Sequence, residues 1–177
     1  MNSAVLVIDV QIGLFDPAPF EAEQVINRIN TVTQKARISG CPVFFIQHET
    51  EKAPLQYKSK NWELHQGLTV LDEDIKIRKT TPDSFLKTNL EKVLKSKRIE
   101  NLFICGYASE FCVDTTVRRA AALGYEVSLI SDAHTTHDKD HATASEIREH
   151  HNRTLPNITS FGPKISAVLC KNIKFSS

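Results

Sequence analysis

Short apolar runs rich in β-branched residues alternate along this chain with longer segments in which apolar residues recur at helical spacing. Such alternation is typical of βαβ units, in which each helix returns the chain so that successive strands run parallel. The expected strands cover residues 4–9, 42–48, 71–77, 102–107, 126–130 and 157–160. The expected helices cover residues 21–38, 85–95, 112–123, 142–152 and 163–171.

These elements predict an α/β fold, a three-layer α/β/α sandwich of Rossmann-like type whose mainly parallel sheet has about six strands. The chain has 177 residues, 41% of them apolar, which suffices for one good core, whereas two independent domains would each be small. We therefore expect a single domain over residues 1–177. Segment 49–70 is polar and shows no regular helix or strand pattern. Because so long a loop is usually functional, we expect it to cover a functional site.

The composition narrows the class of partner. Basic and acidic residues nearly cancel to a net charge of +1, which lacks the electrostatic footprint of a nucleic-acid binder and favours a small-molecule ligand. The sequence shows neither a secretory leader nor a stretch long enough to span a bilayer, so we expect a soluble cytoplasmic protein. Its four cysteines lack CxxC spacing, which suits reduced thiols and argues against cysteine-bound metal.

Three polar side chains follow predicted strands whose carboxyl ends meet at one edge of the sheet, where loops of α/β proteins converge on ligands. Asp9 ends the first strand, Lys79 follows the third, and Cys112 begins the helix after the fourth. At the first turn of a helix, the macrodipole favours a thiolate and so a nucleophile. Arg78 competes with Lys79, but adjacent strand residues point to opposite faces, so only one of them can point inward.

Ordered sequence motifs across nearly the whole chain carry a family resemblance. The matching pieces are Val7-Ile-Asp-Val-Gln11, Lys79 six residues before Phe85, Gly106-Tyr-Ala-Ser-Glu-Phe-Cys-Val-Asp-Thr-Thr116, Gly124-Tyr-Glu-Val127, Ser131-Asp-Ala-His134 and His150-His-Asn152. In this set the chain resembles cysteine hydrolases of the isochorismatase-like superfamily, which includes nicotinamidases and N-carbamoylsarcosine amidohydrolases.

The resemblance implies a catalytic triad of Asp9, Lys79 and Cys112. Asp9 would take the thiol proton, Cys112 would attack an amide-type carbonyl to form a thioester, and Lys79 would hold positive charge beside both. The backbone N–H groups of Ala108 and Cys112 would form the oxyanion hole, with a cis peptide bond between Tyr107 and Ala108. On this basis Asp9→Asn would abolish turnover and leave the fold intact.

Several further residues are candidates for contacts with the substrate, each with a structural alternative. Gln11 would contact the ligand or satisfy backbone groups, and Glu110 and Phe111 would line the pocket or lie on a solvated loop. The aromatic candidates for pocket walls, or for packing, are Phe15, Tyr57, Trp62 and Tyr107. His48 and His65 would contact substrate or form hydrogen bonds within loops. Asp132 and His134 are expected to fix loop geometry.

We expect no cofactor and no metal. The histidine-rich segment 134–151 invites a zinc interpretation. However, nicotinamidases carry their metal on an Asp-x-His pattern after the second strand, where this chain has Gln47-His48-Glu49. This departure counts against both a metal and nicotinamide as the substrate.

The predicted activity is cysteine-dependent hydrolysis of a C–N bond in a small amide or ureido substrate, by a homo-oligomer such as a dimer or tetramer. Vinyl-ether hydrolysis of isochorismate is the nearest alternative, and the cysteine at position 112 argues against it. A non-enzymatic redox sensor, in which Cys112 is oxidised, is the alternative from another class. A flavodoxin-like nucleotide binder is disfavoured because the turn after Asp9 lacks phosphate-binding glycines.

Overall fold

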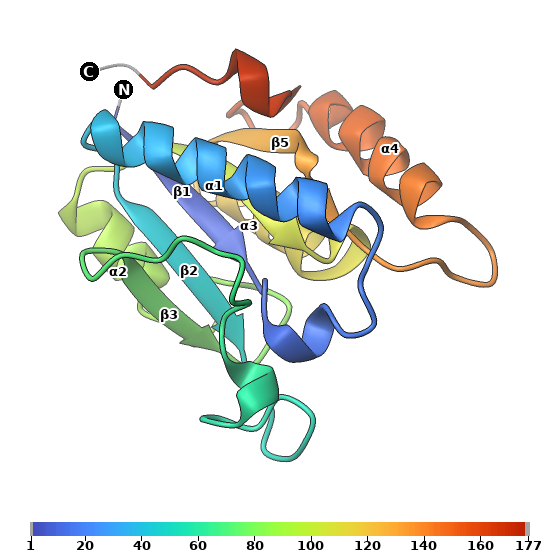
Figure 1. The fold of residues 1–177 in the computed structure, drawn as a ribbon. Coiled ribbons are helices and arrows are strands. Elements are labelled where there is room, and N and C mark those ends of the chain that lie inside the picture. Colours follow the sequence, from blue (N-terminus) through green and yellow to red (C-terminus); the bar gives the residue numbers. More distant parts are fainter. Residues whose placement is uncertain (1, 176–177) are drawn as a thin grey trace.

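The computed structural model describes residues 2–175, in which a six-stranded sheet lies between two layers of helices (Figure 1). The strands are β1 (Ser3–Ile8), β2 (Val43–His48), β3 (Ile75–Lys79), β4 (Asn101–Tyr107), β5 (Glu126–Thr135) and β6 (Ile165–Val168). The helices are α1 (Ala22–Ile38), α2 (Leu90–Ser96), α3 (Asp114–Ala122) and α4 (Ala144–Thr154). The strands pair in parallel in the order β3-β2-β1-β4-β5-β6, which confirms the predicted three-layer α/β fold.

Both faces of the sheet are buried around β1, β2 and β4, which explains why these strands read as continuous apolar runs rather than as alternating patterns. On β1, Val5 and Val7 pack with α1 on one face, while Leu6 and Ile8 pack with α2 and α3 on the other. α1 is seen crossing the near face of the sheet in Figure 1. No helix within residues 2–175 combines the length and apolar content needed to cross a bilayer.

The C-terminal prediction is wrong. The residues predicted as a strand, 157–160, contain the end of a 3-10 turn, Leu155–Asn157, and an irregular segment. The residues predicted as a helix, 163–171, contain β6, which pairs with β5 from Val127↔Ile165 to Ile130↔Val168. A proline followed by apolar residues looks like a helix start, but the open edge of β5 offers backbone partners and an apolar contact that override this local preference.

Helix α2 begins at Leu90 rather than at residue 85. The chain before it turns, because Asp83 Oδ1 accepts hydrogen bonds from the backbone N–H groups of Phe85 and Leu86 at 2.8 and 3.3 Å. Lys87 then adopts a φ of 57°, which no α-helix accommodates. Phe85 reaches the core from this turn without helical backbone, whereas Leu86 is exposed.

The predicted elements 71–77, 112–123 and 126–130 exist with shifted boundaries. β3 runs over Ile75–Lys79, where it pairs with β2. A π-helical turn, Ser109–Val113, precedes α3, so Cys112 lies in this turn rather than in the first turn of an α-helix. β5 continues to Thr135 because it pairs with β4 again after a register shift.

Gly106, the residue of β4 beside Ile8, marks a close approach of two strands. Its φ is 118°, and a Cβ atom at this position would lie 2.1 Å from the backbone O of Ile8. Only glycine satisfies both conditions. This approach brings the turn that carries Cys112 close to the end of β1, where Asp9 follows.

We expect Gly106→Ala to lower the free energy of unfolding by roughly 3 kcal/mol or more, because backbone strain and overpacking add. Gly124→Ala is the matched control: its φ is 95° and no atom lies within 4 Å of the added Cβ, so strain alone should cost about 1–2 kcal/mol. Urea unfolding compares the two variants. Equal losses would contradict a tight contact between β1 and β4.

Candidate active site

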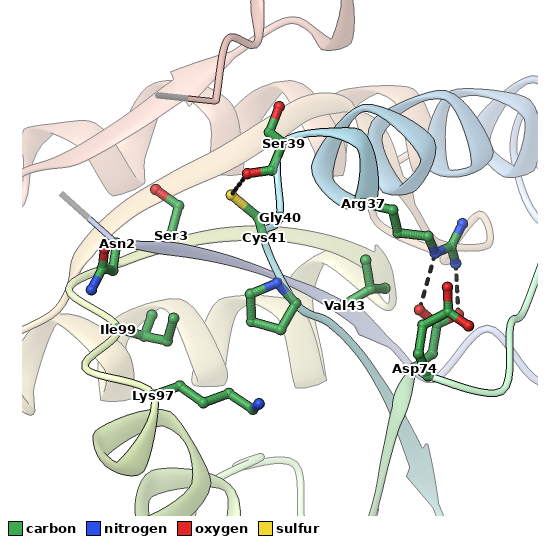
Figure 2. Close-up of a pocket in the computed structure, with 12 residues that line it drawn as sticks. Asn2, Ser3, Arg37, Ser39, Gly40, Cys41, Val43, Asp74, Lys97 and Ile99 are labelled. Carbon is green, nitrogen blue, oxygen red and sulfur yellow. Dashed lines mark hydrogen bonds and ion pairs between the residues drawn. The ribbon is translucent and has the colours of Figure 1, made fainter. Parts of the chain in front are cut away.

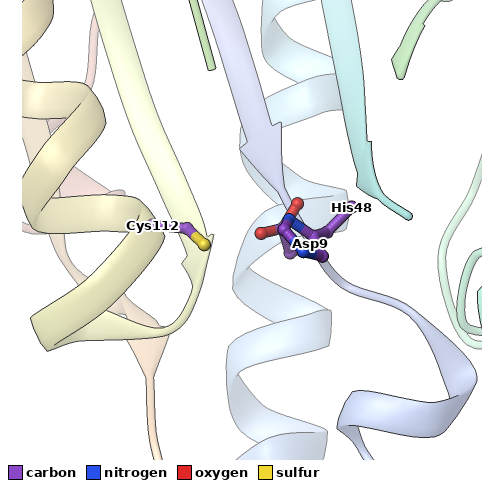
Figure 3. A group of neighbouring side chains, drawn as sticks. All are labelled: Asp9, His48 and Cys112. Carbon is purple, nitrogen blue, oxygen red and sulfur yellow. The ribbon is translucent and has the colours of Figure 1, made fainter. Parts of the chain in front are cut away.

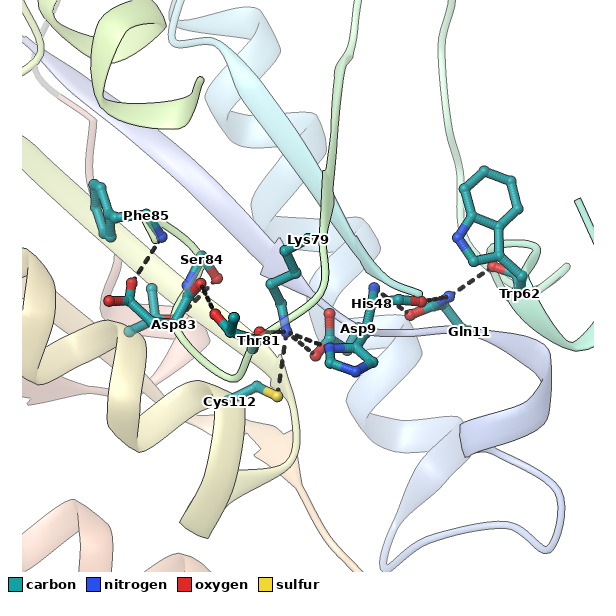
Figure 4. A network of polar contacts seen from close by, with 11 residues as sticks. Asp9, Gln11, His48, Trp62, Lys79, Thr81, Asp83, Ser84, Phe85 and Cys112 are labelled. Atoms are coloured by element: carbon teal, nitrogen blue, oxygen red, sulfur yellow. Dashed lines mark hydrogen bonds and ion pairs between the residues drawn. The ribbon is translucent and has the colours of Figure 1, made fainter. Parts of the chain in front are cut away.

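The structure brings Asp9, Lys79 and Cys112 together at the carboxyl edge of the sheet (Figure 4). Asp9 directly follows β1, Lys79 is the last residue of β3, and Cys112 lies in the π-helical turn after β4. Lys79 Nζ lies 2.7 Å from Asp9 Oδ2 and 3.2 Å from Cys112 Sγ. The ammonium group thus connects the carboxylate to the sulfur, across residues separated by 70 and 33 positions in the chain.

Strand alternation selects Lys79 over its neighbour. Lys79 is 2% exposed, whereas Arg78 points outward. The Arg78 guanidinium forms a bidentate ion pair with Glu49 at 2.7 and 2.9 Å and lies 3.5 Å from the ring centroid of Tyr57. Arg78 therefore fastens the loop after β2 to the outer face of β3 while Lys79 enters the site.

Four acceptors surround the Lys79 ammonium. Besides Asp9 and Cys112, they are the backbone O of Thr81 at 3.1 Å and His48 Nδ1 at 3.3 Å. These contacts offset the cost of removing the cation from water.

Asp9 is held rigidly and keeps one oxygen free of partners. It is 1% exposed, has a φ of 52°, and donates its backbone N–H to Ile46 O at 2.9 Å. Its Oδ2 is engaged by Lys79, but its buried Oδ1 has no hydrogen-bond partner among the described residues. An unpaired buried carboxylate oxygen is costly unless it serves a purpose, and a proton acceptor is what it can be here.

The environment raises the pKa of Cys112 to about 12, which corrects the expected low thiol pKa. Burial is the largest cause, and the negative charge of Asp9 adds to it, while Lys79 acts in the opposite direction. The expected stabilisation of a thiolate by the first turn of an α-helix does not apply, because Cys112 lies in the π-helical turn before α3 begins at Asp114. Burial therefore dominates the pKa of the thiol. The resting sulfur is therefore a thiol, and a nearby base is needed to make it a nucleophile.

The backbone next to Cys112 has part of its predicted form. The peptide bond between Tyr107 and Ala108 is cis, as expected. The carbonyl O of Ala108 accepts hydrogen bonds from Phe111 and Val113, each at 3.1 Å, which closes the π-helical turn. An oxyanion hole made by the N–H groups of Ala108 and Cys112 stays a prediction.

A buried hydrogen-bond chain holds this turn in place. Ser109 Oγ lies 2.8 Å from His134 Nδ1, and His134 Nε2 lies 2.9 Å from Asn152 Oδ1 of α4. Burial lowers the pKa of His134 to about 4, so the ring is neutral and links β5, α4 and the turn by hydrogen bonds. His134 thus fixes loop geometry, as its place in the sequence motif suggested. The role of Ser109 was not predicted, and no spacing in the sequence marks it.

Gln11 is tied to backbone groups. It is fully buried, its Nε2 donates to the carbonyl O atoms of His48 and Trp62 at 2.9 and 2.7 Å, and its Oε1 accepts from the His48 N–H at 2.8 Å. This use of all its polar atoms favours the structural alternative for Gln11.

The aromatic candidates pack against one another. Phe15 lies against Tyr107 and His65 with ring centroids 5.8 and 5.5 Å apart. The Tyr107 hydroxyl lies 2.9 Å from His137 Nδ1, and Trp62 contacts the ring of Tyr57 edge to face. Packing is therefore established for these residues, and their contacts with substrate stay predictions.

Glu110 and Phe111 line a cavity of about 610 Å³ between the π-helical turn and α4. Glu110 Oε1 accepts from Thr136 at 2.8 Å and pairs with Lys139 at 3.2 Å. Phe111 is 55% exposed, and the Lys139 ammonium lies 5.6 Å from the centroid of its ring. Cys112 is not among the described residues that line this cavity, so the cavity lies beside the turn that carries Cys112 and does not enclose the sulfur.

A second cavity, of about 600 Å³, lies at the opposite end of the sheet, near the start of β1 and β2 (Figure 2). Its lining includes Ser3, Cys41 and the ion-paired Arg37 and Asp74. Parallel α/β sheets bind ligands beyond the carboxyl ends of their strands, and this cavity lies at the other end, away from Asp9, Lys79 and Cys112.

The site contains three metal-type donors, but Lys79 occupies the space between them. The side-chain donor atoms of Asp9, His48 and Cys112 lie within 4.8 Å of one another (Figure 3). Lys79 Nζ contacts all three at 2.7 to 3.3 Å, so a fixed cation already neutralises this group. In segment 134–151, His134 and His137 direct their ring nitrogens to protein atoms, which does not favour the zinc interpretation.

Comparison with known proteins identifies the family. The isochorismatase domain family matches residues 3–159. Streptothricin hydrolase of Streptomyces noursei is 34% identical over 138 residues, covering 76% of this chain and 50% of that protein. Ureidoacrylate amidohydrolase RutB of Caulobacter vibrioides is 27% identical over 171 residues, covering 75% of this chain and 76% of RutB.

A solved structure agrees with these sequence relationships. The crystal structure of an isochorismatase family protein has a TM-score of 0.86 and 32% identity to this chain, covering 94% of it and 98% of the other. The chain belongs to the isochorismatase family of hydrolases, as the sequence motifs indicated.

The charge environment predicts opposite effects of two substitutions on the alkylation of Cys112. Asp9→Asn removes a charge that raises the thiol pKa, so iodoacetamide at pH 8 should react faster, while Lys79→Met should slow it. Intact mass measures the rates, with Cys112→Ala as the unlabelled control because the other cysteines are buried. Slower alkylation of Asp9→Asn would mean that the loss of Asp9 as a proton acceptor outweighs the loss of its charge.

The buried ion pair also changes the expectation that Asp9→Asn leaves the fold intact. Removing one partner leaves an uncompensated buried charge, so the free energy of unfolding should fall by about 3–5 kcal/mol. The double variant Asp9→Asn/Lys79→Met should recover most of this loss without recovering activity. Urea unfolding tests both, and a double variant no more stable than the single one would contradict the pairing.

Proposed function

We propose that this protein hydrolyses a C–N bond in a small amide or ureido substrate through a thioester on Cys112. The observation that carries the proposal is the Lys79 ammonium, placed 2.7 Å from the Asp9 carboxylate and 3.2 Å from the Cys112 sulfur. A base, a fixed cation and a thiol in contact are the components of nucleophilic acyl transfer. The relationship to RutB, named as an amidohydrolase, supports the same reaction class.

In the acylation step, Asp9 takes the proton of the Cys112 thiol, and the resulting thiolate attacks the carbonyl carbon. The free Asp9 Oδ1 is the acceptor for this proton, since Oδ2 is bound to Lys79. The tetrahedral intermediate then breaks its C–N bond. Ammonia or an amine leaves with the proton from Asp9, and a thioester remains on Cys112.

In the deacylation step, Asp9 takes a proton from water, and the hydroxide attacks the thioester carbonyl. The C–S bond breaks, the carboxylic acid leaves, and the sulfur recovers its proton from Asp9. Lys79 stays charged throughout and limits the build-up of negative charge on the carboxylate and the sulfur.

The thiol environment favours this reaction over the two alternatives. A redox sensor needs an accessible thiolate of low pKa, whereas burial raises the pKa of Cys112 to about 12. Vinyl-ether hydrolysis would leave Cys112 unused, although it contacts the ammonium at the centre of the site.

The cellular setting is part of the same proposal. We propose a cytoplasmic enzyme acting on a small molecule, assembled as a homo-oligomer. The four cysteines are free and none is paired within residues 2–175, which supports a reducing compartment.

Incubation with a panel of small primary amides and ureido acids tests the function. We expect ammonia release and a transient acyl adduct by intact mass, both lost in Cys112→Ala, with turnover reduced at least about 10³-fold in Asp9→Asn. Cys41→Ala, at the opposite end of the sheet, is the control that should keep turnover. An adduct of oxygen mass alone, without released ammonia on any substrate, would favour the sensor.

A further inference from the structure

The proposed mechanism gives no role to His48, whose side chain contacts Lys79. His48 ends β2, opposite Lys79 in the pairing of β2 with β3. The Gln11 side chain forms hydrogen bonds with both backbone groups of His48, the N–H and the carbonyl O. The backbone that carries the imidazole is therefore held in place, and Nδ1 lies 3.3 Å from Lys79 Nζ (Figure 4).

The Lys79 ammonium has three N–H groups but four acceptors. Asp9 Oδ2 is the nearest at 2.7 Å, and the backbone O of Thr81 is fixed at 3.1 Å. Cys112 Sγ and His48 Nδ1, at 3.2 and 3.3 Å, are left to share the third N–H. The two distances are nearly equal, so the chemical state of the sulfur decides which acceptor receives it.

We propose that His48 is a positioning residue whose Nδ1 accepts the third Lys79 N–H while Cys112 is acylated, and returns it when the sulfur becomes a thiolate. This inference rests on the proposed thioester mechanism. A thiolate is a strong acceptor for an ammonium, whereas a thioester sulfur is a weak one. Without His48, the buried ammonium would carry an unmet N–H during deacylation, at high cost.

The role requires a neutral ring with its proton on Nε2. Burial, followed by the Lys79 charge, lowers the pKa of His48, while the charge of Asp9, a hydrogen bond with the Thr81 backbone and the charge of Glu49 act in the opposite direction. The net lowering keeps the ring uncharged at neutral pH. Cys112 Sγ, the remaining titratable group here, lies within 4.8 Å of the His48 donor atom.

Nitrogen-15 NMR of the histidine rings tests the hydrogen bond without any substrate. At pH 7.5 we expect His48 in the Nε2–H tautomer, assigned by the loss of its signals in His48→Gln. Alkylation of Cys112 with iodoacetamide, which leaves a weakly accepting thioether, should shift the Nδ1 resonance to lower frequency, and Cys112→Ala should reproduce the shift. Lys79→Met should abolish it. An Nδ1–H tautomer, or an Nδ1 resonance unmoved in Cys112→Ala, would overturn the proposal.

Kinetics on an amide found by the panel separate positioning from substrate contact. In place of His48, an Asn side chain puts an acceptor oxygen near the position of Nδ1, and a Gln side chain puts one near the position of Nε2. We expect His48→Asn to stay within about threefold of wild type, and His48→Gln and His48→Phe to lose about tenfold in kcat at unchanged KM, with acyl-enzyme accumulating. Rescue by Gln instead of Asn, with KM affected, would overturn the proposal in favour of substrate contact. Because the NMR result needs no substrate, failure of the proposed function is distinguishable from failure of this inference.

Discussion

The buried contact between Lys79 and Asp9 is the interaction on which the rest of the structure depends. Placing an ammonium and a carboxylate in the interior is expensive, and it is tolerated only where the remaining hydrogen-bonding capacity is met. Here the sheet order supplies what is needed: β2 separates β3 from β1, so Lys79 reaches past His48 to Asp9. The turn after β4 then brings Cys112 to the same cation from the other side.

The same contact accounts for the division of roles among the three side chains. Because Lys79 engages Oδ2 of Asp9, only Oδ1 is available to a proton, and that oxygen has no other partner in residues 2–175. Because burial raises the pKa of Cys112 to about 12, the proposed mechanism assigns the removal of the thiol proton to Asp9. The proposed chemistry thus depends on unequal environments of neighbouring groups rather than on an intrinsically reactive thiol.

The sequence was informative where local pattern and topology agree. Strand runs such as Val43–His48 are apolar enough to require burial on both faces, and parallel strands necessarily gather Asp9, Lys79 and Cys112 at one edge. Prediction failed where tertiary contacts decide: Ile165–Val168 is a strand because β5 offers it an edge. It also failed for the thiol pKa and for Ser109, since burial and a hydrogen bond to His134 leave no periodic trace in the sequence.

The opposite orientations of Arg78 and Lys79 have a consequence for how this chain tolerates changes in length. Inserting or deleting one residue within β3 would turn the guanidinium inward and the ammonium out to solvent, so that strand is fixed in register. The loop after β2 is held at separate anchors, on Arg78 through Glu49 and Tyr57, and on Gln11 through the carbonyl O of Trp62. Natural variants with new specificities are therefore expected to differ in the number of loop residues between these anchors, and not within the strand.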